Sequence, residues 1–136
     1  MRVIVLVLLV MVLVRVSGVV AAEWVALGNA GSGDDYYDIY VNPGTIRKSG
    51  NMVKIWSMLD FKTTRVVPGR PSLSVKLQTE SDCTNARLRF LYHTRHSGNM
   101  GKGNVVSNDD GVPGNWSSVP PASINESLWK YACGKR

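Results

Sequence analysis

Alternating apolar and polar residues are the feature that most limits how this chain can fold. The alternation is clean in Ser72–Gln78 and nearly as clean in Ala86–Arg95, as in strands that bury one face of a sheet. Asn42-Pro43-Gly44 predicts a turn that ends one strand, and Arg65–Pro71, with two prolines and a glycine, predicts a loop. In chain order, the expected strands are Glu23–Leu27, Asp35–Val41, Asn51–Phe61, Ser72–Gln78, Ala86–Arg95 and a short one at Val105–Val106.

The pattern changes to a helical period only near the C-terminus. Ser123 and Glu126 fit a capping box, in which each side chain satisfies a backbone N–H of the first helical turn. Ile124, Leu128, Tyr131 and Ala132 then share one side of a helix that ends at Gly134. A chain of 136 residues has room for about one core. The sequence therefore predicts a single α+β domain, with an antiparallel sheet of five to six strands and one C-terminal helix packed on it.

Residues 1–22 have the pattern of a secretory signal peptide. The apolar run from Val3 to Val14 suits a signal core and is shorter than the ~20 residues that span a bilayer. Val20-Ala21-Ala22 offers small residues for cleavage before Glu23, which would leave no transmembrane segment, whereas Arg15 leaves an uncleaved anchor as the alternative. We assign residues 23–136 to the folded domain. This domain keeps a mild basic excess, which favours acidic partners weakly and does not by itself indicate nucleic acid.

The chain has two cysteines, Cys83 and Cys133. In an exported domain of this size, the simplest expectation is that they pair as a disulfide. A metal pair or a redox couple is the alternative, but the chain has no C-x-x-C and no His/Cys spacing typical of zinc.

The expected solvent face of the sheet combines cations with aromatic rings, which interaction surfaces favour. In the Ala86–Arg95 strand, the pattern predicts that Leu88, Phe90 and Tyr92 face the core and that the arginines face outward. The alternative is a solvated face whose rings are covered by the Arg65–Pro71 loop, the Asn108–Pro121 loop or a second copy of the chain. The candidate binding residues are Tyr36, Tyr40, Lys54, Trp56, Lys76, Arg87, Arg89 and Arg95.

No motif predicts catalysis, a metal or a cofactor. His93 and His96 are three residues apart, so on a strand their rings point to opposite faces. There are two acidic clusters, one of Asp34, Asp35 and Asp38 and the other of Asp109 and Asp110. Neither matches a calcium loop. G-x-S-x-G does not occur, and no serine or threonine forms a plausible nucleophile with a histidine base. We therefore expect a protein that is not an enzyme and that holds no metal or cofactor.

Several short motifs follow one another in a characteristic order. They are Trp24, Tyr36-Tyr37, the run 41–47, Val53-Lys54-Ile55-Trp56, Leu59-Asp60-Phe61, Asp82-Cys83, Trp116, Val119-Pro120-Pro121 and the run from Trp129 to Cys133. Their order resembles the bacterial surface-adhesin protein E family, and the resemblance covers essentially the whole chain after residue 22. It implies an antiparallel sheet, a C-terminal helix packed on it and a Cys83–Cys133 disulfide. It also implies binding of host extracellular-matrix and plasma proteins at the cell surface.

Two functions follow as hypotheses. The first is an exported, non-catalytic binding protein, at the cell surface or secreted, whose partners are host matrix or plasma proteins or an acidic polysaccharide. The second is a periplasmic envelope or stress protein without a host partner. In the first hypothesis, Trp56, Arg87, Arg89 and Arg95 form the centre of the binding face.

Overall fold

The computed structural model describes residues 23–67, 70–109 and 111–135, so the expected signal peptide lies outside the described residues. They form one antiparallel sheet in the order β1-β2-β3-β4-β5-β6, with the short strand β7 also paired to β5. One α-helix, α1, follows the last strand. The element bounds are β1 Val25–Ala30, β2 Tyr37–Ser49, β3 Met52–Val67, β4 Arg70–Asp82, β5 Arg87–His96, β6 Val105–Asn108, β7 Ser117–Ser118 and α1 Ile124–Ala132.

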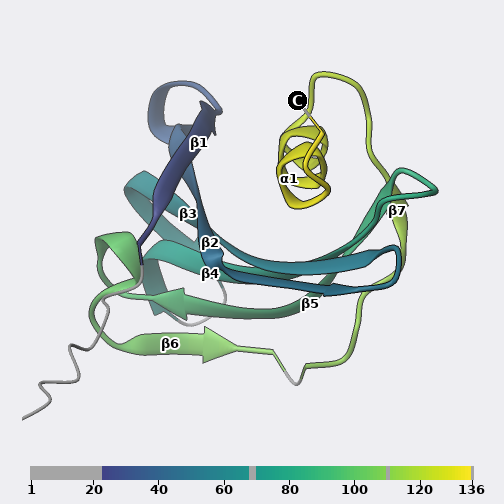
Figure 1. The fold of residues 1–136 in the computed structure, drawn as a ribbon. Helices are drawn as coiled ribbons and strands as arrows, with labels where there is room; N and C mark the ends of the chain where they lie inside the picture. Colours follow the sequence, from purple (N-terminus) through teal and green to yellow (C-terminus); the bar gives the residue numbers. More distant parts are fainter. Residues whose placement is uncertain (1–22, 68–69, 110, 136) are drawn as a thin grey trace, which may run out of the picture.

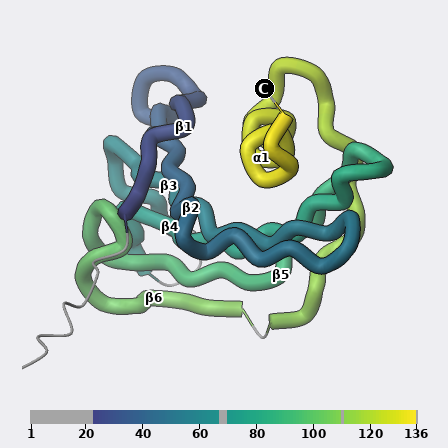
Figure 2. The backbone as a smooth tube through the Cα atoms, viewed as in Figure 1, coloured from purple at the N-terminus to yellow at the C-terminus, as the bar shows by residue number. Residues whose placement is uncertain are grey.

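The sheet is strongly bent, and α1 lies in the hollow of the bend (Figures 1 and 2). We call the side that carries α1 the inner face and the opposite side the outer face. The core lies between α1 and the inner face, which confirms the predicted α+β arrangement. Its fully buried members are Ile39 and Val41 of β2, Val53 and Ile55 of β3, and Leu128 and Ala132 of α1.

Helix α1 begins where its sequence predicts, and the Ser123 half of the predicted capping box forms, whereas the Glu126 carboxylate accepts from Lys130 Nζ at 2.7 Å. The Ser123 hydroxyl accepts a hydrogen bond from the Glu126 N–H at 3.1 Å, which caps the first turn. At the other end, the Trp129 Nε1–H donates to the Asp82 carbonyl at 2.9 Å, and Cys133 is bonded to Cys83. The predicted disulfide therefore ties the end of the helix to the turn between β4 and β5.

Strand β2 is longer than predicted. Asn42-Pro43-Gly44 does not end the strand but forms a bulge, and pairing with β3 resumes at Arg47 and continues to Ser49. The Thr45 hydroxyl donates to the Asn42 carbonyl at 2.6 Å and accepts from the Trp56 N–H at 2.9 Å, so side-chain bonds replace ladder bonds where proline interrupts the strand.

The loop predicted at Arg65–Pro71 is also mostly strand. β3 continues to Val67 and β4 begins at Arg70, and the pairs Arg65–Ser72 and Val66–Pro71 belong to the ladder. Pro71 therefore belongs to the paired part of a long hairpin.

A bulge in β5 changes the predicted faces. Gln78 pairs with Tyr92 but Thr79 pairs with Phe90, so Leu91 is an extra residue without a partner. Residues after Leu91 consequently reverse their side relative to a simple alternation. Tyr92 lies on the outer face instead of in the core, and His93 and Arg95 lie on the inner face instead of outward.

Candidate binding surfaces of the sheet

The outer face brings together most of the candidate residues predicted from the sequence. The strand register places Tyr40, Lys54, Trp56, Lys76, Arg87 and Arg89 on this face. Tyr36 directly precedes β2, and its hydroxyl donates to the Asp38 carboxylate at 3.0 Å. Arg95 is the exception, since it lies opposite Val75 on the inner face.

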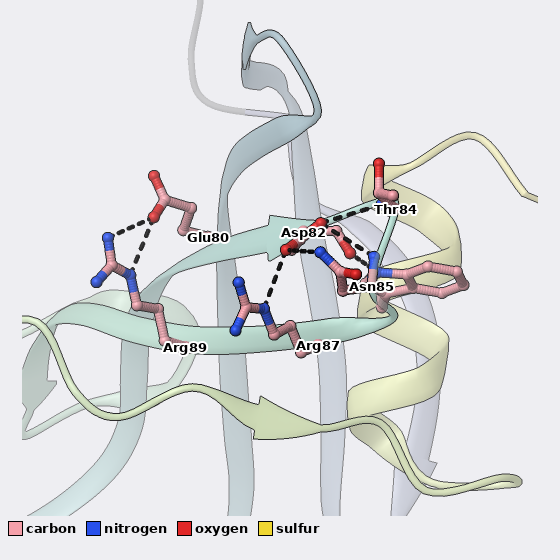
Figure 3. A network of polar contacts seen from close by, with 7 residues as sticks. Glu80, Asp82, Thr84, Asn85, Arg87 and Arg89 are labelled. Carbon is pink, nitrogen blue, oxygen red and sulfur yellow. Dashed lines mark hydrogen bonds and ion pairs between the residues drawn. The ribbon is translucent and has the colours of Figure 1, made fainter.

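Arg87 and Arg89 are held by carboxylates of the neighbouring strand (Figure 3). The Arg87 Nε donates to Asp82 Oδ2 at 3.0 Å, and Arg89 donates twice to Glu80 Oε1, at 3.0 and 2.7 Å. Both carboxylates are buried, and each pairing follows from the cross-strand register. The arginines therefore compensate buried charge within the domain.

Asp82 is the most heavily bonded carboxylate in this network. It accepts hydrogen bonds from the backbone N–H groups of Thr84 and Asn85, from the Asn85 side chain and from Arg87. These bonds, the one from the Asn85 side chain foremost, lower the pKa of Asp82 from its ordinary 3.8 to about 2. The same residue accepts the Trp129 indole through its backbone carbonyl, so the turn, the strand and the helix meet here.

Trp116 covers the two arginines. Its ring centroid lies 4.6 Å from the guanidinium carbon of Arg87 and 4.6 Å from that of Arg89, within cation–π range. The segment before and after Trp116 is fixed along β5, because Gly114 N–H donates to the Phe90 carbonyl at 2.8 Å and Ser117 pairs with Leu88. Part of the outer face is thus covered by the Asn108–Pro121 segment, one of the alternatives expected from the sequence.

A pocket on the outer face remains open beside this covered part. Its volume is about 270 Å³, and two tryptophans contribute its aromatic surface. Trp56 also makes an edge-to-face contact with Tyr92, with ring centroids 5.9 Å apart. The lining residues are Trp24, Asn42, Thr45, Trp56, Lys76, Thr94 and His96.

His96 forms the buried end of this pocket and acts as a neutral hydrogen-bonding group. Its Nε2 lies 2.9 Å from the Thr94 hydroxyl, and burial, reinforced by the Lys76 charge, lowers the pKa of His96 below 6.5. The other histidine, His93, lies on the inner face, with Nδ1 2.8 Å from Asp109 Oδ2. The two rings thus point to opposite faces, as the strand period predicted.

Two cations beside the pocket are exposed. Lys54 of β3 lies opposite Arg47 of β2 on the outer face, and neither side chain forms an ion pair among the described residues. The Arg47 guanidinium donates only to the Gly44 and Ile46 carbonyls. Arg47 was not predicted as a site residue, because the strand was expected to end at Pro43. We call the set Trp24, Arg47, Lys54, Trp56 and Lys76 the outer patch.

The opposite end of the outer face is more acidic. Asp38 and Asp60 lie side by side in the register, and Asp60 Oδ1 accepts the Met100 N–H at 2.7 Å. A hydrogen bond to Asp38 is the main cause that raises the pKa of Tyr36, whereas burial is the main cause for Tyr40. Tyr36 and Tyr40 are therefore neutral phenols beside carboxylates, and the Lys62 Nζ lies 5.3 Å from the centroid of the Tyr36 ring.

The residues 97–104 fold over this end of the face. Gly101 has a φ of 69°, which favours glycine, and a side-chain carbon there would also lie 2.3 Å from Lys76 Cε. Met58 lies on the outer face and is fully buried. Lys76 is consequently held along its aliphatic part while it lines the pocket.

Neither a metal centre nor a membrane-spanning helix is found in the part of the chain that the structure describes. No three His, Cys, Asp or Glu side chains converge there, and none of the described helices has the length and hydropathy to cross a bilayer.

Comparisons with known proteins agree on one family. Residues 24–134 match the family model described as surface-adhesin protein E. Two crystal structures of Haemophilus influenzae protein E superpose with a TM-score of 0.61 at 15% identity: one covers 83% of this chain and 97% of its own, and the other, from a non-typeable strain, covers 85% and 78%. No curated protein matches the sequence. The structural likeness shows a shared fold, and the family model identifies the lineage.

Proposed function

The chain belongs to the surface-adhesin protein E family, and from this membership we propose that it is an exported, non-catalytic binding protein. We propose further that its outer patch binds acidic groups of partners outside the cytoplasmic membrane. The partners in this proposal are host extracellular-matrix or plasma proteins, or an acidic polysaccharide.

One observation carries the proposal: two tryptophans and unpaired cations meet at one pocket on an open face. Trp24 and Trp56 line the pocket together with Lys76, and Lys54 and Arg47 lie exposed on the same face. Aromatic rings contribute most of the contact energy in many interfaces, and free cations supply attraction to carboxylate or sulfate groups.

The arginine pair proposed from the sequence has a different role. Arg87 and Arg89 direct their hydrogen bonds to Asp82 and Glu80 and stack against Trp116. Releasing them for a partner would leave two buried carboxylates unpaired, which is costly. Arg47, Lys54 and Lys76 form no ion pair among the described residues, so they are the cations we assign to the binding patch. Lys54 stands opposite Glu80 in the β3–β4 register, but it is Arg89 that bonds the Glu80 carboxylate.

The non-catalytic part of the proposal is supported by how the titratable groups are used. Among the described residues, His93 is bonded to Asp109 and His96 to Thr94. Neither pair is completed by a third described side chain into an activated nucleophile with its base and an orienting group. The two cysteines are consumed in the disulfide.

Surface exposure and binding test this proposal together. Intact cells that produce the protein are treated with a membrane-impermeant amine reagent, with a known periplasmic protein as the control. The purified protein is then assayed against heparin and a panel of extracellular-matrix proteins. The proposal predicts labelling on intact cells and saturable, salt-sensitive binding. Labelling only after the outer envelope is opened, without binding, would instead support the periplasmic alternative.

A further inference from the structure

A second hollow lies on the inner face, beside the helix rather than beneath it. It has a volume of about 300 Å³, and its floor is apolar. Phe90 is 44% exposed there, although it lies on the same face of the sheet as the fully buried Leu88. The lining residues, which we call the inner groove, are Leu59, Phe61, Val75, Leu77, Phe90, His93 and Arg95.

The inner groove continues the surface on which α1 packs. Leu59 contacts the core cluster and also lines the groove, so the apolar surface passes without a break from the covered part to the open part. In the covered part, α1 places Leu128 and Ala132 on residues of β2 and β3. The apolar floor continues onto the next residues of β3 and β4, where Phe61 and Val75 are buried and Leu59 and Leu77 are half-buried.

The charge at the groove is positive and available. The Arg95 guanidinium forms no hydrogen bond or ion pair with any residue that the structure describes, although the Arg95 backbone pairs with β4 and β6. Arg65 lies over the Phe61 ring, with 5.1 Å between the guanidinium carbon and the ring centroid, and it also pairs with Asp35. His93 is occupied by Asp109. An occupant therefore meets an apolar floor and one unpartnered guanidinium, which favours a carboxylate in bidentate geometry.

We propose that the inner groove is a second binding site, which takes a peptide segment of a partner protein with apolar side chains next to a carboxylate. The inference rests on the proposed binding function, since it supplies a second contact for a protein partner. A volume of about 300 Å³ lies at the lower end of ligand cavities, so the groove suits a few side chains of a longer segment. Docking apolar side chains into a groove beside a fixed helix is a recurrent mode of peptide recognition.

The test is a selection that works without an identified partner. A phage-displayed library of random 12-residue peptides is panned on the oxidised wild-type protein, and enriched peptides are titrated against variants. Phe90→Ala and Arg95→Ala change exposed or half-exposed side chains, and near-ultraviolet circular dichroism checks their fold. Lys54→Ala, on the outer face, is the matched control.

The proposal predicts enriched peptides that combine an acidic residue with leucine or aromatic residues. Phe90→Ala and Arg95→Ala each weaken them about tenfold or more, while Lys54→Ala leaves them unchanged. Failure to enrich any peptide, enrichment of sequences without acidic residues, or equal affinity for the folded Phe90 and Arg95 variants would overturn the inner-groove site. Because heparin binding is read separately on Lys54→Ala, failure of the inner groove is distinguishable from failure of the outer patch.

Discussion

The ring centroid of Trp116 lies 4.6 Å from the guanidinium carbon of Arg89, whose Nε and Nη2 both donate to the Glu80 carboxylate. A residue from the segment after β6 is thereby stacked on an ion pair between β4 and β5. Arg87 and Arg89 alternate with core residues in the sequence, which predicts that they face solvent. In the structure they stabilise the fold through these contacts. The stacking also assigns a structural role to a tryptophan outside the regular strands.

Replacing Trp116 is expected to weaken the fold more than its place in an irregular segment suggests. Trp116→Ala removes two cation–π contacts, each worth about 0.5–1 kcal/mol at exposed sites. Urea unfolding should therefore show a loss of about 1–2 kcal/mol. Arg89→Lys, which keeps the charge but loses the planar guanidinium, should reproduce part of the loss. A midpoint that both variants leave unchanged contradicts the stacking.

Acid should destabilise the domain partly through Asp82. The folded state holds the pKa of Asp82 at about 2, below its ordinary 3.8. A depressed carboxyl pKa contributes stability that is fully present above the ordinary value and is lost as pH falls through 3.8 toward about 2. Asp82→Asn should therefore flatten the fall in unfolding free energy over this pH interval. Parallel pH profiles for wild type and Asp82→Asn would show that Asp82 is not the group responsible.

Loss of the disulfide should loosen the helix from the sheet. Cys83 and Cys133 are 50 residues apart, and the chain-entropy model assigns about 4 kcal/mol, as an upper figure, to closing such a loop. Cys133→Ser should lower the melting temperature and change the fluorescence of Trp129, which is bonded to the Asp82 carbonyl. Reduction of the wild type provides the matched comparison, and an unchanged melt in both would mean that the bridge contributes nothing to stability.

Leu88 and Phe90 should respond very differently to truncation, although both lie on the inner face. Leu88 is fully buried, so Leu88→Ala should cost about 2–5 kcal/mol. Phe90 is 44% exposed in the inner groove, and Phe90→Ala should cost clearly less. Chemical unfolding of the two variants checks this, and equal losses would place Phe90 in the core, where simple alternation put it.

The main elements of the fold could be predicted because they depend on local patterns. The capping residues Ser123 and Glu126 located the helix start, and the two cysteines indicated the bridge. The core residues Ile39 and Val41 of β2, and Val53 and Ile55 of β3, likewise stand at every second position of their strands.

The binding surfaces were less predictable because bulges decide which residues share a face. The extra residue Leu91 moves Arg95 and Tyr92 to the opposite sides, and nothing local marks that position. The Pro43-Gly44 pair was interpreted as the end of a strand, which hid Arg47. Likewise, the pairing of Arg89 with Glu80 depends on the β4–β5 register, which the turn after Asp82 sets.

Two charge-matched double variants test whether the outer patch binds acidic groups. Arg47→Ala with Lys54→Ala removes two exposed cations from the outer face. Lys48→Ala with Arg70→Ala removes two exposed cations elsewhere, one opposite Val53 of the inner face and one at the end of the β3–β4 hairpin. Both doubles have the same net charge, so a general charge effect cancels in the comparison.

The measurement is the affinity for immobilised heparin between 0.05 and 0.5 M salt, spanning Debye lengths from more than 10 Å to less than 8 Å. The affinity of the outer-face double is expected to fall about tenfold or more near 0.15 M salt and to become less salt-sensitive, while the control double stays close to the wild type. Equal affinities for the two doubles, or no binding by the wild type, would contradict the outer-patch proposal.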